Sequence, residues 1–537
     1  PGPHGGRWPT MAPVLETFKD EVCVEDVGRW LQKAQSGHHA GTTIIDLPSK
    51  RIGGMGELTL LGTLFMHCPA LRSIRLPGND VDDEGAKFLA QSLRMMEPPT
   101  RLSHIDLSGN RLTATGACAI ARAFMERLHD QEPRPLEPLL DLSDNRLEDH
   151  GVSELARLLE GQTDIRLRLR RVSCTRPGLN DLLKYKDSLS ELDLSSNPIG
   201  TSGTVAVCSA AVAASSWHTL GLAGLRSGDA EQPLRAAPAS DAAEDLLVDT
   251  LVGCVRNSRG LTSLDLSDNA LGDRGCAQLV EALRDRTSHG CAPLRRLSLS
   301  SNACGPRTAQ ALQRALAGSG LRELRLEDNA LDDEAAEKLA DGLARSTTLE
   351  KLYLSRNGIG DKGVEELAKG LKSQCTTVHE AMDGVVNRGQ GSQEVCCLRD
   401  LWLSGNPLGD RCAKALASAA SAVTEAGGSR SPTCQIRAFT KPWGLERLWL
   451  EDLRGAGVQR AGLEALRAAV AARASYADEI SRRLDSQGCG KSSPLAEVVA
   501  ARAKGRPPSG LEVFGLPLAS PEDEKAAEVR RAAHARM

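Results

Sequence analysis

Residues 349–371 read LEKLYLSRNGIGDKGVEELAKGL and contain two different periods. The first half, L-x-x-L-x-L-x-x-N, alternates apolar and polar residues, as a short half-buried strand does. The second half places apolar residues at helical spacing after a glycine turn. The stretch therefore predicts one strand, one turn and one helix. A unit this small cannot bury its own apolar face, so we expect it to be stable only between copies of itself.

The same frame recurs along the chain. Further copies begin at Leu71, Leu102, Leu136, Leu189, Leu261, Leu294, Leu321, Leu398 and Leu445. Three successive frame asparagines, Asn302, Asn329 and Asn357, lie 27 and 28 residues apart by subtraction of their numbers.

Three weaker copies complete the array. The intervals from Asn145 to Asn197 and from Asn197 to Asn269 span about two periods each, so each interval predicts a degenerate repeat. We place these repeats near Ile165 and Leu220, and we interpret Thr43–Ile52 as a worn first repeat.

A 28-residue unit with GxGDxGVxxLAxxL after the Asn resembles the ribonuclease-inhibitor type of leucine-rich repeat. The resemblance covers roughly Thr43–Ala474. It implies an α/β fold, a curved leucine-rich-repeat solenoid (horseshoe) with a parallel sheet on the concave face and helices outside. Parallel strands each need a crossover connection, and the helix of each repeat supplies it with right-handed geometry.

The same pattern predicts the domain organisation. We expect an N-terminal segment with capping helices at 1–41, the solenoid at 42–474, and a cap end with a flexible tail at 475–537. Three breaks in the period predict surface-loop insertions near 228–241, 373–395 and 426–443. Within the tail the apolar island LEVFGLPL, from Leu511, has two open interpretations: docking on the last repeat, or a short linear motif.

Composition bounds the function. A formal net charge of -4 over 537 residues gives no overall field for nucleic acid or anionic membrane. No apolar run reaches the roughly 18 residues of a membrane span.

The 15 cysteines are scattered, and we expect reduced thiols that pack in helices, as at Cys118, Cys208, Cys276 and Cys412. The chain begins at Pro1 and Met11 offers a second start, so residues 1–10 carry no argument.

The frame asparagines are predicted to be structural. At the bend after each strand, a buried amide can pair with backbone groups that leave the ladder. The set comprises Asn79, Asn110, Asn145, Asn197, Asn269, Asn302, Asn329, Asn357 and Asn406.

Binding specificity should instead lie on the outward strand positions. Four residues before each frame Asn, the middle position reads Arg75, Asp106, Asp141, Asp193, Asp265, Ser298, Arg325, Tyr353 and Trp402, and the terminal repeat adds Trp449. Aromatic residues form only 3% of the chain, so three of them in one row of consecutive repeats predict a contact surface. The predicted partner-binding residues are Tyr353, Trp402, Trp449, Arg325, Asp106, Asp141, Asp193 and Asp265.

Each group has an alternative explanation. The tail or an insertion can fold back and cover the rings. The Asp row can be a family pattern, since LDLS is common in this repeat type; if it recognises a partner, that surface should be basic.

Motifs for catalysis and cofactors fail on inspection. GCGKSS, from Gly488, lacks the first glycine of a phosphate-binding loop, because position 485 is Asp485. His38 and His39 have no second ligand pair at metal spacing. No local Ser, His and Asp set or Cys and His pair suggests a nucleophile. We therefore expect no enzyme activity, no cofactor and no metal.

The sequence favours a non-catalytic scaffold that binds a protein partner, with neither nucleic acid nor membrane as partner, in the cytoplasm; a nuclear or cytoskeleton-associated location is the alternative. A Ran-type GTPase activator shares this repeat type, but its strongly acidic C-terminal segment has no match in PEDEKAAEVRRAAHARM at 521–537. A cytoskeletal or ciliary assembly component is the third hypothesis.

Overall fold

The structure is a computed structural model. It describes residues 43–96, 101–129, 131, 134–225, 241–388, 398–426, 447–450, 461–462, 464–470 and 512–514. The chain divides into two compact units, an N-terminal unit at Pro1–Asp265 and a C-terminal unit at Leu266–Met537, and each is described by itself.

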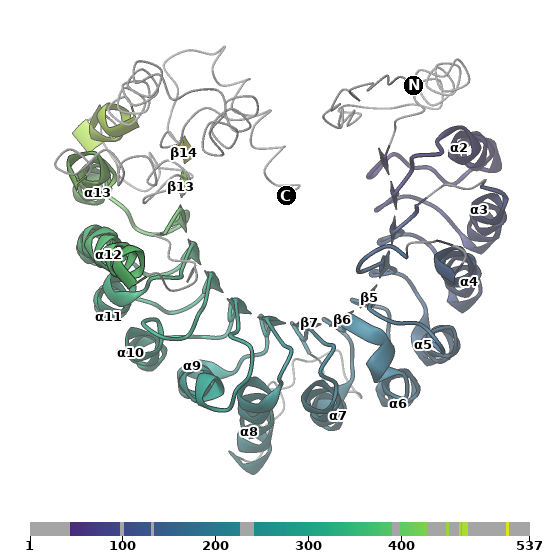
Figure 1. The fold of residues 1–537 in the computed structure, drawn as a ribbon, viewed down its shortest axis with the longest axis horizontal. Coiled ribbons are helices and arrows are strands. Elements are labelled where there is room, and N and C mark those ends of the chain that lie inside the picture. The colour runs from purple at the N-terminus through teal and green to yellow at the C-terminus, as the bar shows by residue number, and fades with distance from the viewer. Residues whose placement is uncertain are drawn as a thin grey trace, which may run out of the picture. The chain divides into compact units, whose positions relative to one another are not determined.

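The N-terminal unit alternates short strands with helices (Figure 1). Its strands are β1 (Ile44–Asp46), β2 (Ser73–Arg75), β3 (His104–Asp106), β4 (Leu139–Asp141), β5 (Ile165–Arg168), β6 (Leu189–Asp193), β7 (Thr219–Gly221) and β8 (Ser263–Asp265). Its helices are α2 (Met55–His67), α3 (Asp83–Met95), α4 (Ala114–His129), α5 (Glu148–Arg157), α6 (Arg176–Leu183), α7 (Gly200–Ala213) and α8 (Asp241–Asn257).

The C-terminal unit repeats the arrangement. Its strands are β9 (Arg296–Ser298), β10 (Glu323–Arg325), β11 (Lys351–Tyr353), β12 (Asp400–Trp402), β13 (Arg447–Trp449) and β14 (Glu512–Phe514). Its helices are α9 (Gly272–Ser288), α10 (Pro306–Ala315), α11 (Asp333–Arg345), α12 (Asp361–Arg388) and α13 (Asp410–Ala426).

In each unit the strands pair in parallel and follow chain order. The described helices lie on the outer side and the sheet lies on the inner, concave side (Figure 1). The leucines of the frame are buried between the two layers, as Leu349, Leu352 and Leu354 are in the opening stretch. This confirms the α/β leucine-rich-repeat solenoid, and the weak repeats expected near Thr43, Ile165 and Leu220 each supply a strand.

The frame asparagines form the predicted ladder. The Asn302 side chain is fully buried; its Oδ1 accepts the N–H groups of Asn269 at 3.1 Å and Leu271 at 3.2 Å. Its Nδ2 donates to the carbonyls of Leu266 at 2.9 Å and Ser300 at 3.0 Å. Asn79, Asn110, Asn145, Asn197, Asn329, Asn357 and Asn406 likewise bond to their own turn and to that of the preceding repeat, which confirms the structural prediction for these positions.

A second ladder, made of aspartates at the helix N-termini, was missed. Asp333 Oδ1 accepts the N–H groups of Gly360 at 2.7 Å and Gly363 at 2.9 Å, which belong to the next repeat. Asp361 does the same for Gly409 at 2.7 Å and Cys412 at 3.1 Å. Each carboxylate thus satisfies free N–H groups of the next helix and lies at its positive end.

This ladder explains a recurring glycine. A Cβ atom at Gly363 would lie 2.6 Å from Asp333 Oδ1, a distance that real Cβ atoms do not reach. Gly363 is needed because the neighbouring repeat approaches closely, and its φ lies outside the left-handed region.

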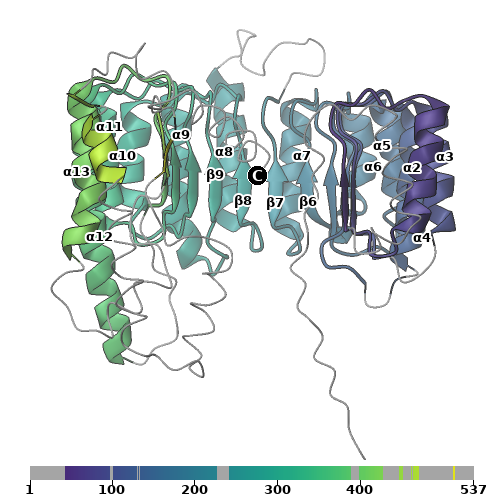
Figure 2. The same ribbon diagram turned by 90° about the horizontal axis from the view of Figure 1, so that it is seen from above.

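The prediction of a loop at 373–395 is wrong for the part that the structure describes. Helix α12 continues to Arg388 and extends past α11 and α13 (Figure 2). The stretch 373–388 has no Pro and only one Gly, Gly384, so a helix begun at Asp361 can propagate through it.

Buried Gln374 fixes the exit of this helix extension from the repeat. Its Nε2 donates to the Ser346 carbonyl at 3.1 Å, and its Oε1 accepts the Leu398 N–H at 3.0 Å. It thereby joins the segments that lead into β11 and β12.

The apolar island of the tail supplies β14, which pairs in parallel with β13. Docking on the last repeat is therefore the arrangement found for Glu512–Phe514. The predicted capping helices at 1–41, the insertions at 228–240 and 427–443, and the rest of the tail from 475 lie outside the described residues.

Candidate protein-binding surface

Strand register in the C-terminal unit places the predicted aromatic positions in one row. Ser298 pairs with Arg325, Arg325 with Tyr353, Tyr353 with Trp402, and Trp402 with Trp449. The row continues from Trp449 to Phe514 of β14. The sequence did not predict Phe514 as a member of this row, because the tail has no repeat frame and therefore no frame Asn from which the position could be counted. The side chains of Trp449 and Phe514 lie outside the described part, so only their backbone positions enter the site.

Three side chains of this row form a stack. The Arg325 guanidinium lies 4.5 Å from the centroid of the Tyr353 ring, and the Tyr353 ring lies 3.8 Å from that of Trp402 with an interplanar angle of 10°. Arg325 comes from the strand before Tyr353 and Trp402 from the strand after it, so the phenol ring is enclosed between them.

Tyr353 is therefore not the exposed anchor that its position predicted. Only 9% of its surface is exposed, whereas Trp402 is half-buried and keeps part of its indole accessible. The difference follows from the stack, because β11 has neighbours on both sides that reach over the ring. Tyr353 supports Trp402 from below, and Trp402 is the ring of the two that a partner can contact.

The stack holds fixed charge states. Burial and the nearby Glu323 carboxylate raise the pKa of Tyr353, so its hydroxyl stays protonated as a hydrogen-bond donor. Burial opposes the charge on Arg325, but Tyr353 and Glu323 outweigh it and raise the pKa of the guanidinium. Arg325 Nε also donates to Glu323 Oε1 at 2.8 Å, which fixes the cation against the ring.

The predicted Asp row lies in the N-terminal unit and is a separate group. Asp106, Asp141 and Asp193 occupy the same row, and each carboxylate accepts an N–H two residues ahead, from Ser108 at 3.0 Å, Ser143 at 3.0 Å and Ser195 at 2.9 Å. These bonds give the LDLS pattern a local role at the bend, which favours the family-pattern explanation. Asp265 shares the row through its pairing with Gly221.

Arginines of the same row balance several of these acids. Arg75 lies between Asp46 at 3.2 Å and Asp106 at 4.0 Å, and Arg168 lies 3.7 Å from Asp141. Burial raises the pKa of Asp141, and the bonds from Ser143 only partly offset that effect.

The degenerate repeat at β5 contributes a charged cluster that the sequence interpretation missed. Glu191 accepts hydrogen bonds from the Nε atoms of Arg166 and Arg168, both at 2.6 Å. Burial opposes the charge on Glu191, but Arg168 and Arg166 outweigh it and lower the pKa of the carboxyl. Burial, together with these two arginines, lowers the pKa of nearby His104. The run IRLRLRR at 165–171 was the sequence feature that could have predicted this cluster. Val172 replaces the frame Asn of this repeat, so the outward strand position could not be found by counting back from an Asn.

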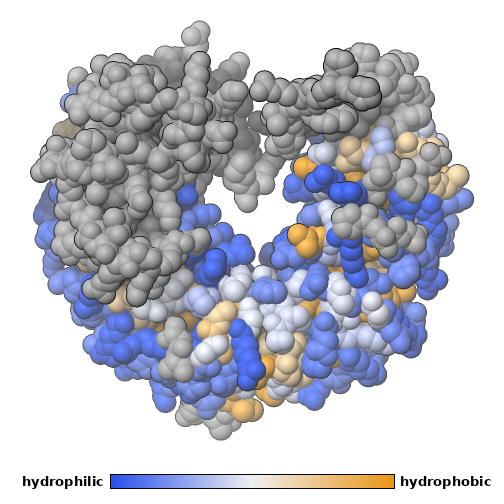
Figure 3. All heavy atoms as spheres, viewed as in Figure 1, coloured by the Kyte–Doolittle hydropathy of each residue, from blue (hydrophilic) through white to orange (hydrophobic). Residues whose placement is uncertain are grey.

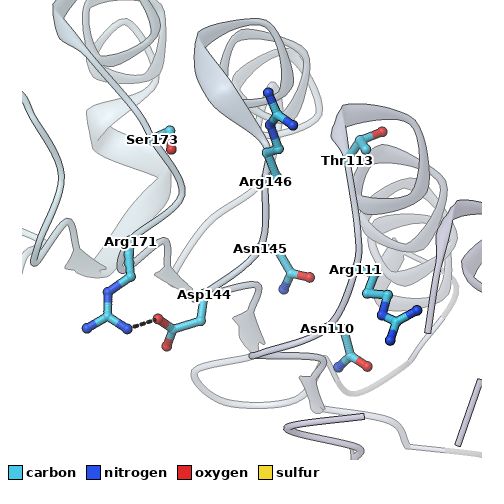
Figure 4. Close-up of a pocket in the computed structure, with 8 residues that line it drawn as sticks. All are labelled: Asn110, Arg111, Thr113, Asp144, Asn145, Arg146, Arg171 and Ser173. Carbon is cyan, nitrogen blue, oxygen red and sulfur yellow. Dashed lines mark ion pairs between the residues drawn. The ribbon is translucent and has the colours of Figure 1, made fainter. Parts of the chain in front are cut away.

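One open pocket of about 570 Å³ lies in the N-terminal unit, at the turns that follow β3, β4 and β5 (Figure 4). Its lining residues are Asn110, Arg111, Thr113, Asp144, Asn145, Arg146, Arg171 and Ser173. Its three arginines are each paired: Arg171 with Asp144 at 2.9 Å, Arg111 with Asp80 at 2.6 Å, and Arg146 with Glu148 at 2.8 Å. The pocket therefore presents balanced charge and no nucleophile and base pair for covalent chemistry.

Among the described residues, no group of three or more His, Cys, Asp or Glu side chains could hold a metal ion. None of the described helices is both long and apolar enough to cross a bilayer. On the face drawn in Figure 3, the described surface is largely hydrophilic, and apolar side chains gather only in small groups.

Comparison with known proteins agrees with the repeat pattern. The family model described as Leucine Rich repeat matches residues 67–90, 100–121, 139–156, 187–208, 257–280, 321–340 and 345–368. Mouse ribonuclease inhibitor is 29% identical over 300 residues, which cover 54% of this chain and 59% of that protein. Human NACHT, LRR and PYD domains-containing protein 5 is 31% identical over 294 residues, which cover 54% of this chain and 22% of that protein.

The chain thus spans less than two thirds of the length of either relative. Among solved structures, one of the yeast Rad7 and Elc1 complex covers 82% of this chain and 86% of its own, with 14% identity and a TM-score of 0.43.

Proposed function

We propose that this chain, a leucine-rich-repeat protein of the ribonuclease-inhibitor type, is a non-catalytic scaffold that binds a protein partner on the concave sheet face of its C-terminal unit. The observation that carries the proposal is the stack of Arg325, Tyr353 and Trp402, which occupy one row of paired positions on three neighbouring strands.

The stack suits a binding anchor for a physical reason. Ordering a flexible side chain on binding costs free energy, and a ring that is already held in place avoids much of that cost. Trp402 is held by Tyr353, and Tyr353 by Arg325. Tryptophan, tyrosine and arginine are also the residues that most often dominate the binding energy of interfaces.

The Asp row of the N-terminal unit has a smaller part in this proposal. Asp106, Asp141 and Asp193 are engaged in bonds within the unit, so we propose them, with Asp265, as a secondary contact for a basic surface. No observation favours the GTPase activator or the cytoskeletal component over the scaffold.

For the location, we propose the cytoplasm. Nine described cysteines are free thiols, which is typical of reducing compartments. Burial raises the pKa of Cys118 to about 11 and that of Cys412 to about 12, so these thiols are protonated and act as packing groups.

The test is chemical crosslinking in lysate followed by mass identification of the partner, with the full chain as bait. The wild-type chain and Trp402→Ala are compared, with Arg75→Ala as the control from the same row of the other unit. We expect specific partners to be lost with Trp402→Ala and kept with Arg75→Ala. Equal capture by all three chains would reject the site.

A further inference from the structure

We infer that the partner segment bound at the C-terminal sheet face is an acidic one, whose carboxylates pair with Arg295 and Arg296 while an apolar side chain packs on Trp402. This inference rests on the proposed function and specifies the chemistry of the partner.

Charge on the sheet faces is the first observation. Three positions of each strand are compared: the first and third residues of its paired core, and the residue directly before that core. In β9–β12 these positions hold six bases and three acids, a balance of +3, from Arg295, Arg296, Arg322, Glu323, Arg325, Glu350, Lys351, Arg399 and Asp400.

In β1–β8 the same positions hold four bases and six acids, a balance of −2, from Asp46, Arg72, Arg75, Asp106, Asp141, Arg166, Arg168, Glu191, Asp193 and Asp265. The two faces therefore have opposite sign, and the cationic one carries the stack although the whole chain has a net charge of -4.

Two of the three acids on the cationic face of β9–β12 form ion pairs with bases of the same face. Glu323 lies 2.8 Å from Arg325 and 3.9 Å from Lys351, and Glu350 lies 3.6 Å from Arg322 and 3.9 Å from Arg399. The third acid, Asp400, is only 1% exposed. Two of the three acids are therefore paired within the unit, and the third is withdrawn from the surface.

The two arginines at β9, unlike these acids, have no ion-pair partner among the described residues. Arg295 and Arg296 are both exposed, and neither forms an ion pair with a residue in the described part of the chain. They lie on the strand next to β10, which carries Arg325 of the stack. Two unpaired guanidinium groups beside a preformed aromatic surface favour a ligand that offers carboxylates and one apolar side chain.

Single-stranded nucleic acid is the other ligand that combines anions with stacking. The geometry disfavours it here. Successive bases stack on several open rings, whereas Tyr353 is enclosed by Arg325 on one side and Trp402 on the other, so Trp402 is the one ring of this stack that keeps accessible surface.

The test is selection from a random peptide library displayed on phage, with the immobilised full chain as target. Four targets are compared: wild type, Arg295→Glu with Arg296→Glu, Trp402→Ala, and Arg72→Glu. Arg72 is the matched control, because it is an exposed arginine in the same outward row of the N-terminal unit. All substituted positions are at least partly exposed, and thermal melting checks that each variant is folded.

We expect wild type and Arg72→Glu to enrich the same peptides, with net negative charge and an apolar or aromatic residue. Enrichment should fall about tenfold or more on the double arginine variant, as charge reversal opposes an acidic ligand. Enriched peptides without acidic bias, no enrichment on wild type, or acidic peptides retained by the double variant would overturn the inference.

The outcomes separate the two proposals. Peptides without acidic bias that are lost on Trp402→Ala would reject the acidic ligand and leave the binding site standing. Peptides that depend on neither Trp402 nor the two arginines would reject both. A fluorescent thymidine oligonucleotide provides the last arm, and its binding to wild type with loss on the double variant would assign the face to nucleic acid instead.

Discussion

The phenol ring of Tyr353 lies parallel to the indole of Trp402, with ring centroids 3.8 Å apart and planes inclined by 10°. Because of this contact, Tyr353 and Trp402 differ in exposure although they occupy the same row of the sheet. Tyr353 is nearly as buried as the core, and Trp402 remains accessible on top of it. Stability and binding should therefore respond differently to the two substitutions.

Tyr353→Ala should destabilise the C-terminal unit more than Trp402→Ala. Removing a buried aromatic ring costs about 3 kcal/mol or more, and Tyr353→Ala also leaves Arg325 and Trp402 without the ring between them. For the half-buried Trp402 we expect about 1–2 kcal/mol, since less area returns to water. Urea unfolding followed by far-UV circular dichroism measures both. A larger effect of Trp402→Ala would contradict the enclosed position of Tyr353.

Asn302→Ala should be among the most damaging single changes of the frame. It removes two acceptor and two donor contacts of a fully buried amide, with Asn269, Leu271, Leu266 and Ser300. Buried backbone groups without partners cost about 1–3 kcal/mol each, so a loss of about 3 kcal/mol or more is expected. Thermal melting tests this, with exposed Arg307→Ala as the control, and equal melting of the two variants would refute the ladder.

Acid should weaken the aspartate ladder through Asp273. Burial opposes the ionisation of Asp273, but the N–H groups of Thr308 and Arg307 and further bonds outweigh it and lower its pKa below the ordinary 3.8. A carboxyl with a lowered pKa stabilises the fold above its unfolded pKa, and the contribution is lost as the pH falls through the lower folded pKa.

Asp273→Asn should therefore be less stable than wild type at neutral pH, and the difference should shrink as the pH falls below about 3.8. Urea midpoints measured across this range provide the test. Because Asp273 is only half-buried, water screens the carboxylate and the difference should be modest. A gap between the two chains that widens in acid would show that the sign is wrong.

Glu191→Ala tests the charged cluster of the degenerate repeat. The change leaves Arg166 and Arg168 without the carboxylate that accepts from both Nε atoms. Removing one partner of a buried ion pair costs about 3 kcal/mol or more, because the remaining charges stay desolvated. Glu191→Gln keeps an acceptor oxygen and should lose less. Denaturant unfolding compares the two, and unchanged stability in Glu191→Ala would contradict the cluster.

Sequence periodicity predicted the fold because the residues that form the strand, the bend and the helix of a repeat all lie within that repeat. Each leucine, the bend Asn and the following helix are specified locally, so even the worn copies near Ile165 and Leu220 could be placed. The aspartate ladder was not visible in this way. Asp333 acts on the helix of the next repeat, 27 and 30 residues away, and its partners are the backbone N–H groups of Gly360 and Gly363. The frame shows that an Asp and these glycines recur, but a contact between backbone and side chain of different repeats cannot be read from that pattern.

The site was predicted in part, for the same reason. Counting back from the frame Asn placed Arg325, Tyr353 and Trp402 in one row, and the register confirms it. Counting could not show which ring covers which, so Tyr353 was expected to be more exposed than it is. It also could not reach Phe514, whose place depends on the pairing of a tail strand with β13.

The affinity of the full chain for its crosslinked partner is the decisive test of binding through Trp402. It is measured by isothermal titration calorimetry for wild type, Trp402→Ala and the control Arg75→Ala, each shown to be folded. We expect Trp402→Ala to bind about 30-fold more weakly, as a loss of about 2 kcal/mol at an interface anchor requires, while Arg75→Ala binds like wild type. Equal affinity of Trp402→Ala and wild type would contradict binding through Trp402.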